Sequence, residues 1–407
     1  MKGQKLPRMI RPTRRELLRG LAGATAGWTL AGATRIADAQ ARPPIKIGIL
    51  CTYTGALASL GQTILDGINL YFDQIDWQIA GRRVELINED DQMSPQVALQ
   101  KARKLLESDH VQAIFGPLAS NVAMAMVNYL GQAQGFWLVT GAGASQMTRL
   151  HMPYMFRCTL STWQVAHPTA EWVYDNIAKE AILTASDYVA GHDILAEFKE
   201  PFIARGGKVL KEIYPPLGTT DFSAYLTDIR SIAPPMTYSF YGGTDSVRFV
   251  TQYAQLGMKE RIKLVGFGSL CDNDTIPSQG RAALGAITSS IYCDTLDNKE
   301  NIAFVAAFRK KYNDFPSVFS ESGYTTARVF AEAARAVQGK VEDKDKLSAA
   351  MVAVNFAAPR GPFRFDPATH HPIQNVYLRQ VVERDGRIAN QPIATIPEVR
   401  DPGIKSG

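Results

Sequence analysis

A short apolar run, a loop of small residues and an amphipathic helix follow one another in residues 45–75. Four of the six residues at 45–50 are Ile or Leu, which is typical of a buried parallel strand. The loop carries Gly55 and Gly61, and glycine adopts backbone angles that other residues avoid. Apolar side chains then recur at helical spacing as far as Ile75. This unit predicts the first strand and helix of an α/β sheet, in which ligands bind at the carboxyl ends of the strands.

The alternation of strand and helix continues along the chain in two sets. The first set places strands at 83–88, 111–115 and 136–140 and helices at 95–106 and 120–130. The second set begins after a crossing near 154–159, with helices at 166–177 and 192–204 and strands at 181–185, 209–214, 237–241, 263–267 and 286–292. Helices at 301–312 and 323–337 and strands at 361–365 and 376–383 follow. Alternating strands and helices form parallel sheets with helices on both faces, so the sequence predicts two α/β lobes.

Residues 1–41 differ in composition from the rest of the chain. They hold eight of the 44 Lys and Arg residues and two of the 39 Asp and Glu residues, so 36 basic and 37 acidic residues remain from Arg42 onward. That balance offers no basic surface to nucleic acid. A basic head, an uncharged stretch at 20–34 and small residues at 37–41 are typical of a cleaved export signal, and residues 13–18 resemble a twin-arginine signal. The alternative is a basic amphipathic helix of the mature domain.

The chain has four cysteines, and an exported protein can form disulfides. The sequence alone leaves three complete pairings open. We expect Cys271 to pair with Cys293, since the two flank successive predicted strands. The alternative is that these two, together with Cys51 and Cys158, are free buried thiols.

Sequence motifs for cofactors, metals and catalysis are missing. Gly141-Ala-Gly143 and Gly266-Phe-Gly268 each lack the third glycine of a dinucleotide-binding loop, and no phosphate-binding, zinc-protease or serine-hydrolase motif occurs. His370-His371 does not have the spacing of a metal-binding pair and is expected in a surface turn. Glu89-Asp90-Asp91 is expected to be a charged loop at a strand end rather than a cation site. We therefore expect no cofactor, no metal and no enzyme activity.

Landmarks over most of the chain resemble, in their order, those of solute-binding proteins of the branched-chain amino-acid class of ABC importers. They are Ile45-Lys-Ile-Gly48, Thr54-Gly55 with Gly61, Gly116-Pro117 with Ser120, Phe156-Arg157, Thr220-Asp-Phe-Ser223, Tyr241-Gly-Gly243, Asn301 with Phe304, Pro316, Tyr324 and Arg360-Gly-Pro-Phe363. The resemblance implies a type I periplasmic-binding fold, in which two doubly wound parallel-sheet lobes are joined by a three-stranded hinge. It places lobe 1 at 42–157 and 291–363, lobe 2 at 158–290 and 364–395, a C-terminal tail at 396–407, and hinge crossings near 156–160, 289–293 and 362–366.

The function that this resemblance implies is the capture of a small-molecule ligand between two closing lobes in the periplasm. The implied partners are the membrane permease and ATPase subunits of an ABC importer, with no nucleic acid, and we expect a monomer. Two other functions stay open, namely an amide or ligand sensor of the same fold and an exported enzyme. A cleaved leader would separate the receptor from a cytoplasmic sensor.

Two stretches of the sequence carry binding chemistry. Ser120 lies at a predicted helix start after Pro117, where a hydroxyl and free backbone amides suit a carboxylate. The alternative role of Ser120 is a plain helix cap. Ala142, Gly143, Ala144 and Ser145 form a loop of small residues whose backbone donors a ligand can approach, with a tight turn as the alternative.

Aromatic residues near the expected cleft offer large apolar faces to a ligand. We name Tyr53, Trp163, Tyr188, Tyr241, Phe267 and Tyr324, with Trp163 first because it follows the first hinge crossing. Each of them has the alternative role of an ordinary core residue.

The ligand class follows from two positions that the resemblance aligns. Branched-chain amino-acid receptors of this family hold the α-ammonium with a glutamate and a tyrosine, where this chain has Gly268 and Thr244. A buried ammonium without a carboxylate partner is costly. We therefore expect a carboxylate without an α-amino group, namely an aromatic or other bulky acid. The alternative is a branched-chain-type amino acid, with Asp245 or Asp272 as the restored ammonium partner.

Overall fold

The computed structural model describes residues 42–403, and the compact unit that carries the fold begins at Pro44. The predicted export signal at 1–41 lies outside the described residues. Within residues 42–403, no helix has both the length and the apolar character that a membrane span requires.

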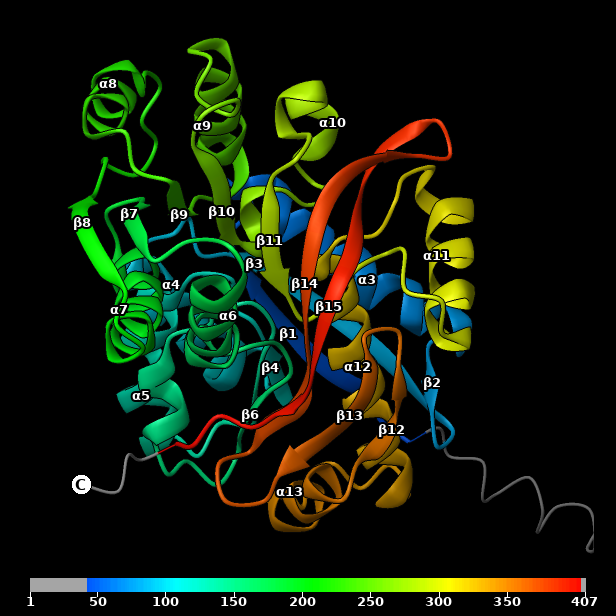
Figure 1. Cartoon of the computed structure of the whole chain (residues 1–407). Coiled ribbons are helices and arrows are strands. Elements are labelled where there is room, and N and C mark those ends of the chain that lie inside the picture. Colours follow the sequence, from blue (N-terminus) through cyan, green and yellow to red (C-terminus); the bar gives the residue numbers. More distant parts are fainter. Residues whose placement is uncertain (1–41, 404–407) are drawn as a thin grey trace, which may run out of the picture. The chain divides into compact units, whose positions relative to one another are not determined.

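The first lobe is built on a six-stranded sheet with the order β2-β3-β1-β4-β5-β6 (Figure 1). Its strands are β1 (Ile45–Cys51), β2 (Gln78–Ile79), β3 (Arg82–Asp90), β4 (Ala113–Phe115), β5 (Trp137–Val139) and β6 (Met155–Arg157). All neighbours are parallel except β2, which pairs antiparallel with β3. The helices between them are α3 (Ala58–Gln74), α4 (Pro95–Arg103) and α5 (Ser120–Gln132). The predicted alternation of strand and helix is confirmed here.

The second lobe contains most of a nine-stranded sheet with the order β12-β13-β14-β11-β10-β9-β7-β8, in which β15 pairs with β14. At one end this sheet continues into the first lobe, whose core includes residues of β12 and β13. Its strands are β7 (Glu180–Ala185), β8 (Lys208–Ile213), β9 (Met236–Phe240), β10 (Lys263–Phe267), β11 (Ile287–Ser290), β12 (Asn355–Ala358), β13 (Gly361–Asp366), β14 (His371–Arg384) and β15 (Arg387–Val399). Strands β7 to β11 are parallel, whereas β14 and β15 form an antiparallel edge beside β11. The predicted parallel sheet is confirmed for β7 to β11, and the antiparallel edge adds to it.

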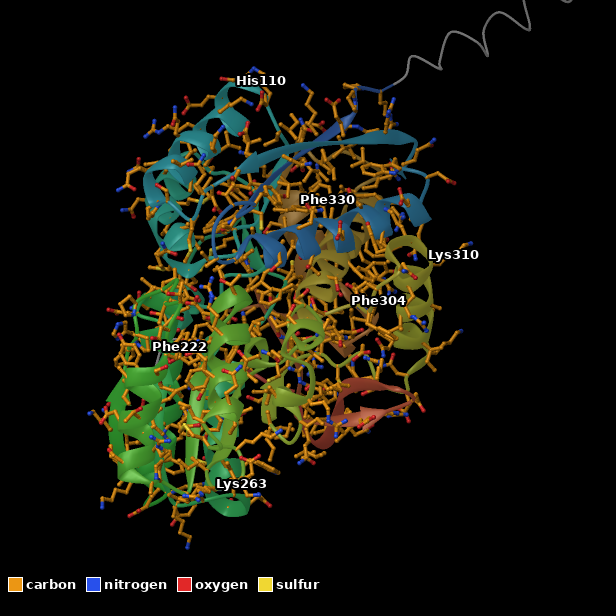
Figure 2. The ribbon with its side chains drawn as sticks, turned by 90° about the horizontal axis from the view of Figure 1, so that it is seen from above. His110, Phe222, Lys263, Phe304, Lys310 and Phe330 are labelled. Carbon is orange, nitrogen blue, oxygen red and sulfur yellow. The ribbon has the colours of Figure 1, made fainter. Side chains whose placement is uncertain are left out.

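Helices cover the sheets of both lobes. Those from Thr162 onward are α6 (Thr162–Asn176), α7 (Val189–Ala204), α8 (Ser223–Ile232), α9 (Gly243–Gln255), α10 (Ile276–Gln279), α11 (Lys299–Tyr312), α12 (Val318–Ala336) and α13 (Lys344–Val352). Separate clusters of apolar side chains fill the two lobes, and Figure 2 labels Phe330 in one of them and Phe222 in the other. Helix α12 returns to the first lobe and packs closely on α3, because a Cβ at Gly323 would lie 2.1 Å from the Ile64 carbonyl oxygen.

The chain passes between the two lobes three times. It leaves the first sheet after β6, and it leaves the second sheet after β11. The third passage runs along β14, whose first residues pair with β13 and whose later residues pair with β11 (Figure 1). The crossing predicted at 362–366 is wrong, because Phe363 and Phe365 are buried in the core of the first lobe, where Phe365 contacts Phe156 edge to face at 5.2 Å.

Two further predictions near the C-terminus are corrected by β14 and β15. The tail was expected from residue 396, but β15 continues to Val399, which pairs with Gln374. His371 was expected in a surface turn, but it is buried and its Nε2 lies 3.3 Å from Gln164 Oε1. Its neighbour His370 stacks on Phe156, with ring centroids 4.3 Å apart.

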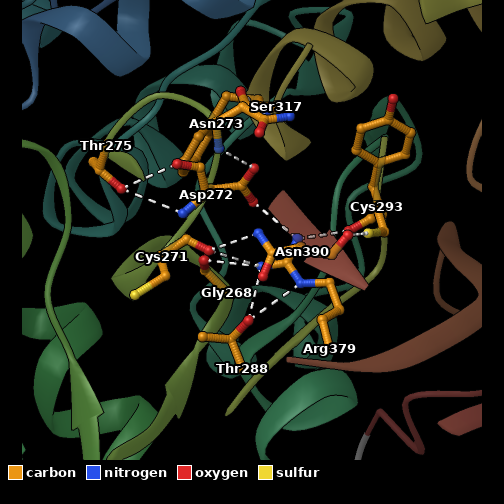
Figure 3. Close-up of polar contacts among 12 residues, drawn as sticks. Gly268, Cys271, Asp272, Asn273, Thr275, Thr288, Cys293, Ser317, Arg379 and Asn390 are labelled. Carbon is orange, nitrogen blue, oxygen red and sulfur yellow. Dashed lines mark hydrogen bonds and ion pairs between the residues drawn. The ribbon is translucent and has the colours of Figure 1, made fainter. Parts of the chain in front are cut away.

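The predicted disulfide between Cys271 and Cys293 is wrong, since all four cysteines are free and buried. The side chains of Arg379 and Asn390 lie between the two residues (Figure 3). Arg379 donates to the carbonyl oxygens of Cys271 and Tyr292, while Cys293 Sγ lies 3.2 Å from the Asn390 carbonyl oxygen. The alternative of free buried thiols is the arrangement that the structure has.

The acidic triplet at 89–91 supports the loop after β1. Asp90 accepts a hydrogen bond from the Tyr53 amide at 2.9 Å, and Asp91 accepts one from Thr52 Oγ1 at 2.7 Å. Glu89 is paired with Lys101 and Lys104. No cluster of His, Cys, Asp and Glu suited to a metal ion occurs among residues 42–403.

Candidate ligand-binding site

A cavity of about 60 Å³ lies where the carboxyl ends of the strands of both sheets face each other. The first lobe contributes the segments that follow β1, β4, β5 and β6, and the second lobe contributes those that follow β7, β9 and β10. The end of β11 and the first turn of α12 complete the wall. This is the position at which an open α/β sheet binds its ligands, here used by two sheets at once.

The wall of the cavity is mainly apolar. Its large side chains are Leu57, Leu60, Leu118, Leu160, Tyr188, Ile194, Phe240, Phe267, Val318 and Phe319. Hydroxyl groups come from Ser120, Thr159, Thr162, Ser269 and Ser290, and from the ring of Tyr188. None of the described residues that line the cavity is Asp, Glu, Lys, Arg or His. A neutral wall of this kind favours an apolar body held by a small number of hydrogen bonds.

Ser120 is the first residue of α5 and is 2% exposed. Ala119 occupies the cap position and no side chain caps the helix, so the alternative role of Ser120 as a plain cap is not the one seen. Ser120 Oγ accepts a hydrogen bond from the Ala144 amide at 3.2 Å. The hydroxyl hydrogen of Ser120 has no acceptor among the described residues, and Ser120 lines the cavity beside the partial positive charge of the helix start.

Only Gly143 of the predicted 142–145 loop lines the cavity, while Ala142 and Ala144 are buried behind it. Arg157 holds the loop from behind, because its guanidinium donates to the carbonyl oxygens of Gly143 at 3.0 Å and Ala144 at 2.8 Å. Burial lowers the pKa of Arg157 to about 10. Arg157 thus positions the loop, a role that the sequence analysis did not foresee.

Ser145 does not line the cavity and instead joins the two lobes. Its hydroxyl lies 2.6 Å from Thr162 Oγ1 and accepts from the Trp163 amide at 3.0 Å. Its amide donates to Asp193 Oδ2 at 2.9 Å, which connects the first lobe to α7 of the second. Nearby, Arg149 is paired with Glu197 of α7 at 3.3 Å, and burial raises the pKa of that carboxyl.

The opposite side of the cleft is closed by contacts between α3 and the second lobe. Thr63 Oγ1 donates to Asp274 Oδ1 at 2.9 Å, and burial raises the pKa of Asp274 to about 7. The Thr244 amide donates to the Ala56 carbonyl oxygen at 3.3 Å. Thr244 is exposed and lies outside the cavity wall, so its predicted position in the site becomes a position at the rim.

The predicted aromatic residues divide between the cavity and the core. Tyr188 and Phe267 line the cavity, and burial raises the pKa of the Tyr188 hydroxyl. Tyr241 is buried on the far side of the sheet, where its hydroxyl lies 2.5 Å from Thr184 Oγ1 and its ring stacks on Phe249. Trp163 stacks on His167, and Tyr324 donates a hydrogen bond to Gln74 Oε1 at 2.7 Å. Trp163, Tyr324 and Tyr53 do not line the cavity.

The two carboxylates considered as ammonium partners are engaged outside the cavity. Asp245 accepts from Ser186 Oγ at 3.2 Å and from the Gly218 amide at 2.9 Å. Asp272 is paired with Arg379 at 3.0 Å. Burial raises the pKa of both carboxyls. Neither of them reaches the cavity wall.

Gly268 lines the cavity, and the loop that carries it is held by Arg379 (Figure 3). The Arg379 guanidinium donates to the Gly268 carbonyl oxygen at 3.0 Å and to Thr288 Oγ1 at 3.1 Å. Because the other side of the guanidinium is paired with Asp272, the loop is fixed by a buried and fully bonded cation.

Most of the apolar wall was not predicted from the sequence. Leu57 and Leu60 lie in the loop and helix start after β1, and Phe240 is the last residue of β9. Apolar residues at or just after the predicted strand ends were the signal that would have found them. Val318 and Phe319 were not predicted as wall residues because the helix was expected to begin at residue 323. Helix α12 begins five residues earlier, directly after its cap residue Ser317.

Comparison with known proteins gives a consistent result. The periplasmic binding protein family matches residues 44–387. Leu/Ile/Val-binding protein homolog 6 of Brucella melitensis is 31% identical, covering 94% of this chain and 98% of that protein. An ABC transporter substrate-binding protein from Sphaerobacter thermophilus is 37% identical with a TM-score of 0.83, covering 88% of this chain and 99% of that one. A solute-binding protein of an ABC transporter from R. palustris, solved in complex with benzoate, is 33% identical with a TM-score of 0.84, covering 89% and 99%.

Proposed function

Because the chain belongs to the periplasmic binding protein family, we propose that it is an ABC-importer substrate-binding protein whose ligand is an aromatic carboxylate. The observation that carries this proposal is the chemistry of the cavity wall. Apolar side chains from both lobes surround the space, and the charged residues are absent from the described wall. Ser120 and the start of α5 supply the donors that a carboxylate needs.

An amino acid fits this wall less well than an aromatic acid does. An α-ammonium group needs an anionic or strongly accepting partner once it is removed from water. Asp245 and Asp272 are turned to other partners, and the wall has glycine at position 268. The benzoate complex of the R. palustris relative supports an aromatic acid as the ligand class.

Contacts at both sides of the cleft support capture by closure of the two lobes. Asp193 with Ser145 joins the lobes at one side, and Asp274 with Thr63 joins them at the other. We assign the hinge to the passages after β6 and β11 and to β14. The bound protein would then present one closed surface to the permease and ATPase subunits of its importer. Residues 1–41 are proposed to direct export to the periplasm, where such relatives act.

A thermal-shift panel tests the ligand class. Ligand at a hundred times its Kd adds about 2.7 kcal/mol to the free energy of unfolding, so a true ligand raises the melting temperature by several degrees. We expect the shift with benzoate and hydroxybenzoates and none with leucine or valine. A rise in melting temperature with leucine or valine, and with no aromatic acid, would contradict the proposal and indicate that the protein binds amino acids.

Replacement of Ser120 by alanine tests the carboxylate donor. A hydrogen bond to a charged group contributes about 1.5–3 kcal/mol, so Ser120→Ala should weaken binding of the aromatic acid about tenfold to a hundredfold by calorimetry. The matched control is Ser223→Ala, because Ser223 is also the first residue of a helix without a side-chain cap but is exposed and lies outside the cavity. Equal affinities in Ser120→Ala and the unmodified protein would rule out the Ser120 hydroxyl as a ligand donor.

A further inference from the structure

The hydroxyl groups on the cavity wall are not equivalent in their partners. Ser120 accepts from Ala144, Thr159 lies 3.2 Å from Ser322 Oγ, Thr162 lies 2.6 Å from Ser145 Oγ, and Ser269 donates to the Tyr241 carbonyl oxygen at 2.9 Å. Ser290 differs from them, because its Oγ is buried and has no hydrogen-bond partner within the described part of the chain. The residue is 1% exposed.

Ser290 lies on the hinge side of the cavity. It is the last residue of β11, directly before the chain passes towards α11, and Thr159 comes from the passage that follows β6. Successive side chains of a strand point to opposite faces, so the neighbouring Ser289 points away from the site and is not part of the wall.

Gly268 keeps the Ser290 hydroxyl open to the cavity. A Cβ at position 268 would lie 2.9 Å from Ser290 Oγ, so any side chain there would cover this group. Both residues line the cavity, and Arg379 fixes the Gly268 carbonyl from the other side. The wall therefore contains an open space at Gly268 with the buried, unpaired Ser290 hydroxyl at its edge.

This inference rests on the proposed function: we propose that Ser290 recognises a hydroxyl substituent on the ring of the bound aromatic acid. A buried hydroxyl without a partner loses its hydrogen bonds with water and regains none. A ring hydroxyl both donates and accepts, so it satisfies Ser290 and is itself satisfied. Ser120 and the start of α5 hold the carboxylate, and Ser290 forms a hydrogen bond with the hydroxyl substituent on the ring. Unsubstituted benzoate fills the same apolar wall but leaves Ser290 unpaired.

Calorimetry with benzoate, meta-hydroxybenzoate and para-hydroxybenzoate tests the proposal. The unmodified protein should bind at least one hydroxybenzoate more tightly than benzoate. Ser290→Ala should reduce that selectivity ratio by about two- to tenfold, the range for one neutral hydrogen bond. Its affinity for benzoate itself should not fall and can rise, since benzoate makes no bond to the lost hydroxyl and no longer leaves it buried without a partner.

The matched control is Ser289→Ala, because Ser289 also has a buried hydroxyl without a partner but lies outside the cavity wall. It should leave the selectivity ratio unchanged. If Ser290→Ala lowers the affinities for all three acids equally, or if the unmodified protein prefers benzoate, the role of Ser290 is disproved while the aromatic-acid function stands. If Ser290→Ala does not fold, the unmodified protein still provides a test, because tighter binding of benzoate than of either hydroxybenzoate would disprove the proposal. Binding of none of the three acids would instead disprove the proposed function.

Discussion

Replacement of Arg360 by methionine should remove about 3–5 kcal/mol from the free energy of unfolding. Arg360 and Glu321 form an ion pair in which both side chains are 0% exposed. The Arg360 guanidinium also donates to the Cys158 carbonyl oxygen at 3.2 Å and to Gln374 Oε1 at 3.0 Å. Methionine keeps much of the volume but leaves the Glu321 carboxylate buried without its cation. Urea unfolding followed by circular dichroism measures the loss.

The position of Arg360 makes this effect specific to the hinge. Cys158 belongs to the first passage between the lobes and Gln374 to β14, which is the third passage. The matched control is Arg364→Met, because Arg364 is paired with Glu398 at 2.6 Å in an exposed position. Exposed pairs contribute about 0–1 kcal/mol. If the two variants lose similar amounts of stability, Arg360 does not have the structural role that we assign to it.

The strands and helices with strong apolar patterns were predictable from the sequence. Residues 263–267 were predicted as a strand and form β10. The predicted starts of two helices were several residues too late. Ser161 caps α6 and Ser317 caps α12, and each cap precedes the apolar pattern on which the prediction was based. Helix α9 and strand β15 were missed. Strands β14 and β15 are joined by the two-residue turn Asp385-Gly386, in which both residues have positive φ. Asp-Gly is a local signal for such a hairpin, and the prediction did not use it.

The candidate site was predictable in its location but not in its side chains. Ser120, Gly143, Tyr188, Phe267 and Gly268 were named and line the cavity. Tyr241 was named in place of its neighbour Phe240, which lines the cavity instead. Consecutive residues of a strand point to opposite faces, so a shift of one residue at the end of a strand exchanges a wall residue for a core residue. The partners of Asp245 and Asp272 come from distant parts of the chain, and only the folded structure reveals them.

Replacement of Arg379 by methionine should damage both stability and the site. Arg379 is 0% exposed and its guanidinium bonds to Asp272, Thr288 and the Gly268 carbonyl oxygen (Figure 3). Loss of the cation leaves the Asp272 carboxylate buried and unpaired, which costs about 3–5 kcal/mol. The loop at Gly268 also loses its support, so the Kd for the aromatic acid should rise. Urea unfolding and calorimetry measure the two effects separately.

The destabilisation of Arg379→Met should depend on pH, because burial raises the pKa of Asp272 and Arg379 opposes that rise. Without Arg379, the pKa in the folded state lies further above the unfolded value of about 3.9. A carboxyl with a raised folded pKa destabilises the fold as pH rises from the unfolded to the folded pKa. The loss of stability should therefore be smaller at acidic pH than at neutral pH.

Asp272→Asn introduced together with Arg379→Met should recover part of the stability, since it removes the unpaired charge. It should not restore the Kd, because the Gly268 carbonyl still lacks its donor. Full recovery of the Kd in the double variant would show that Arg379 does not position the loop.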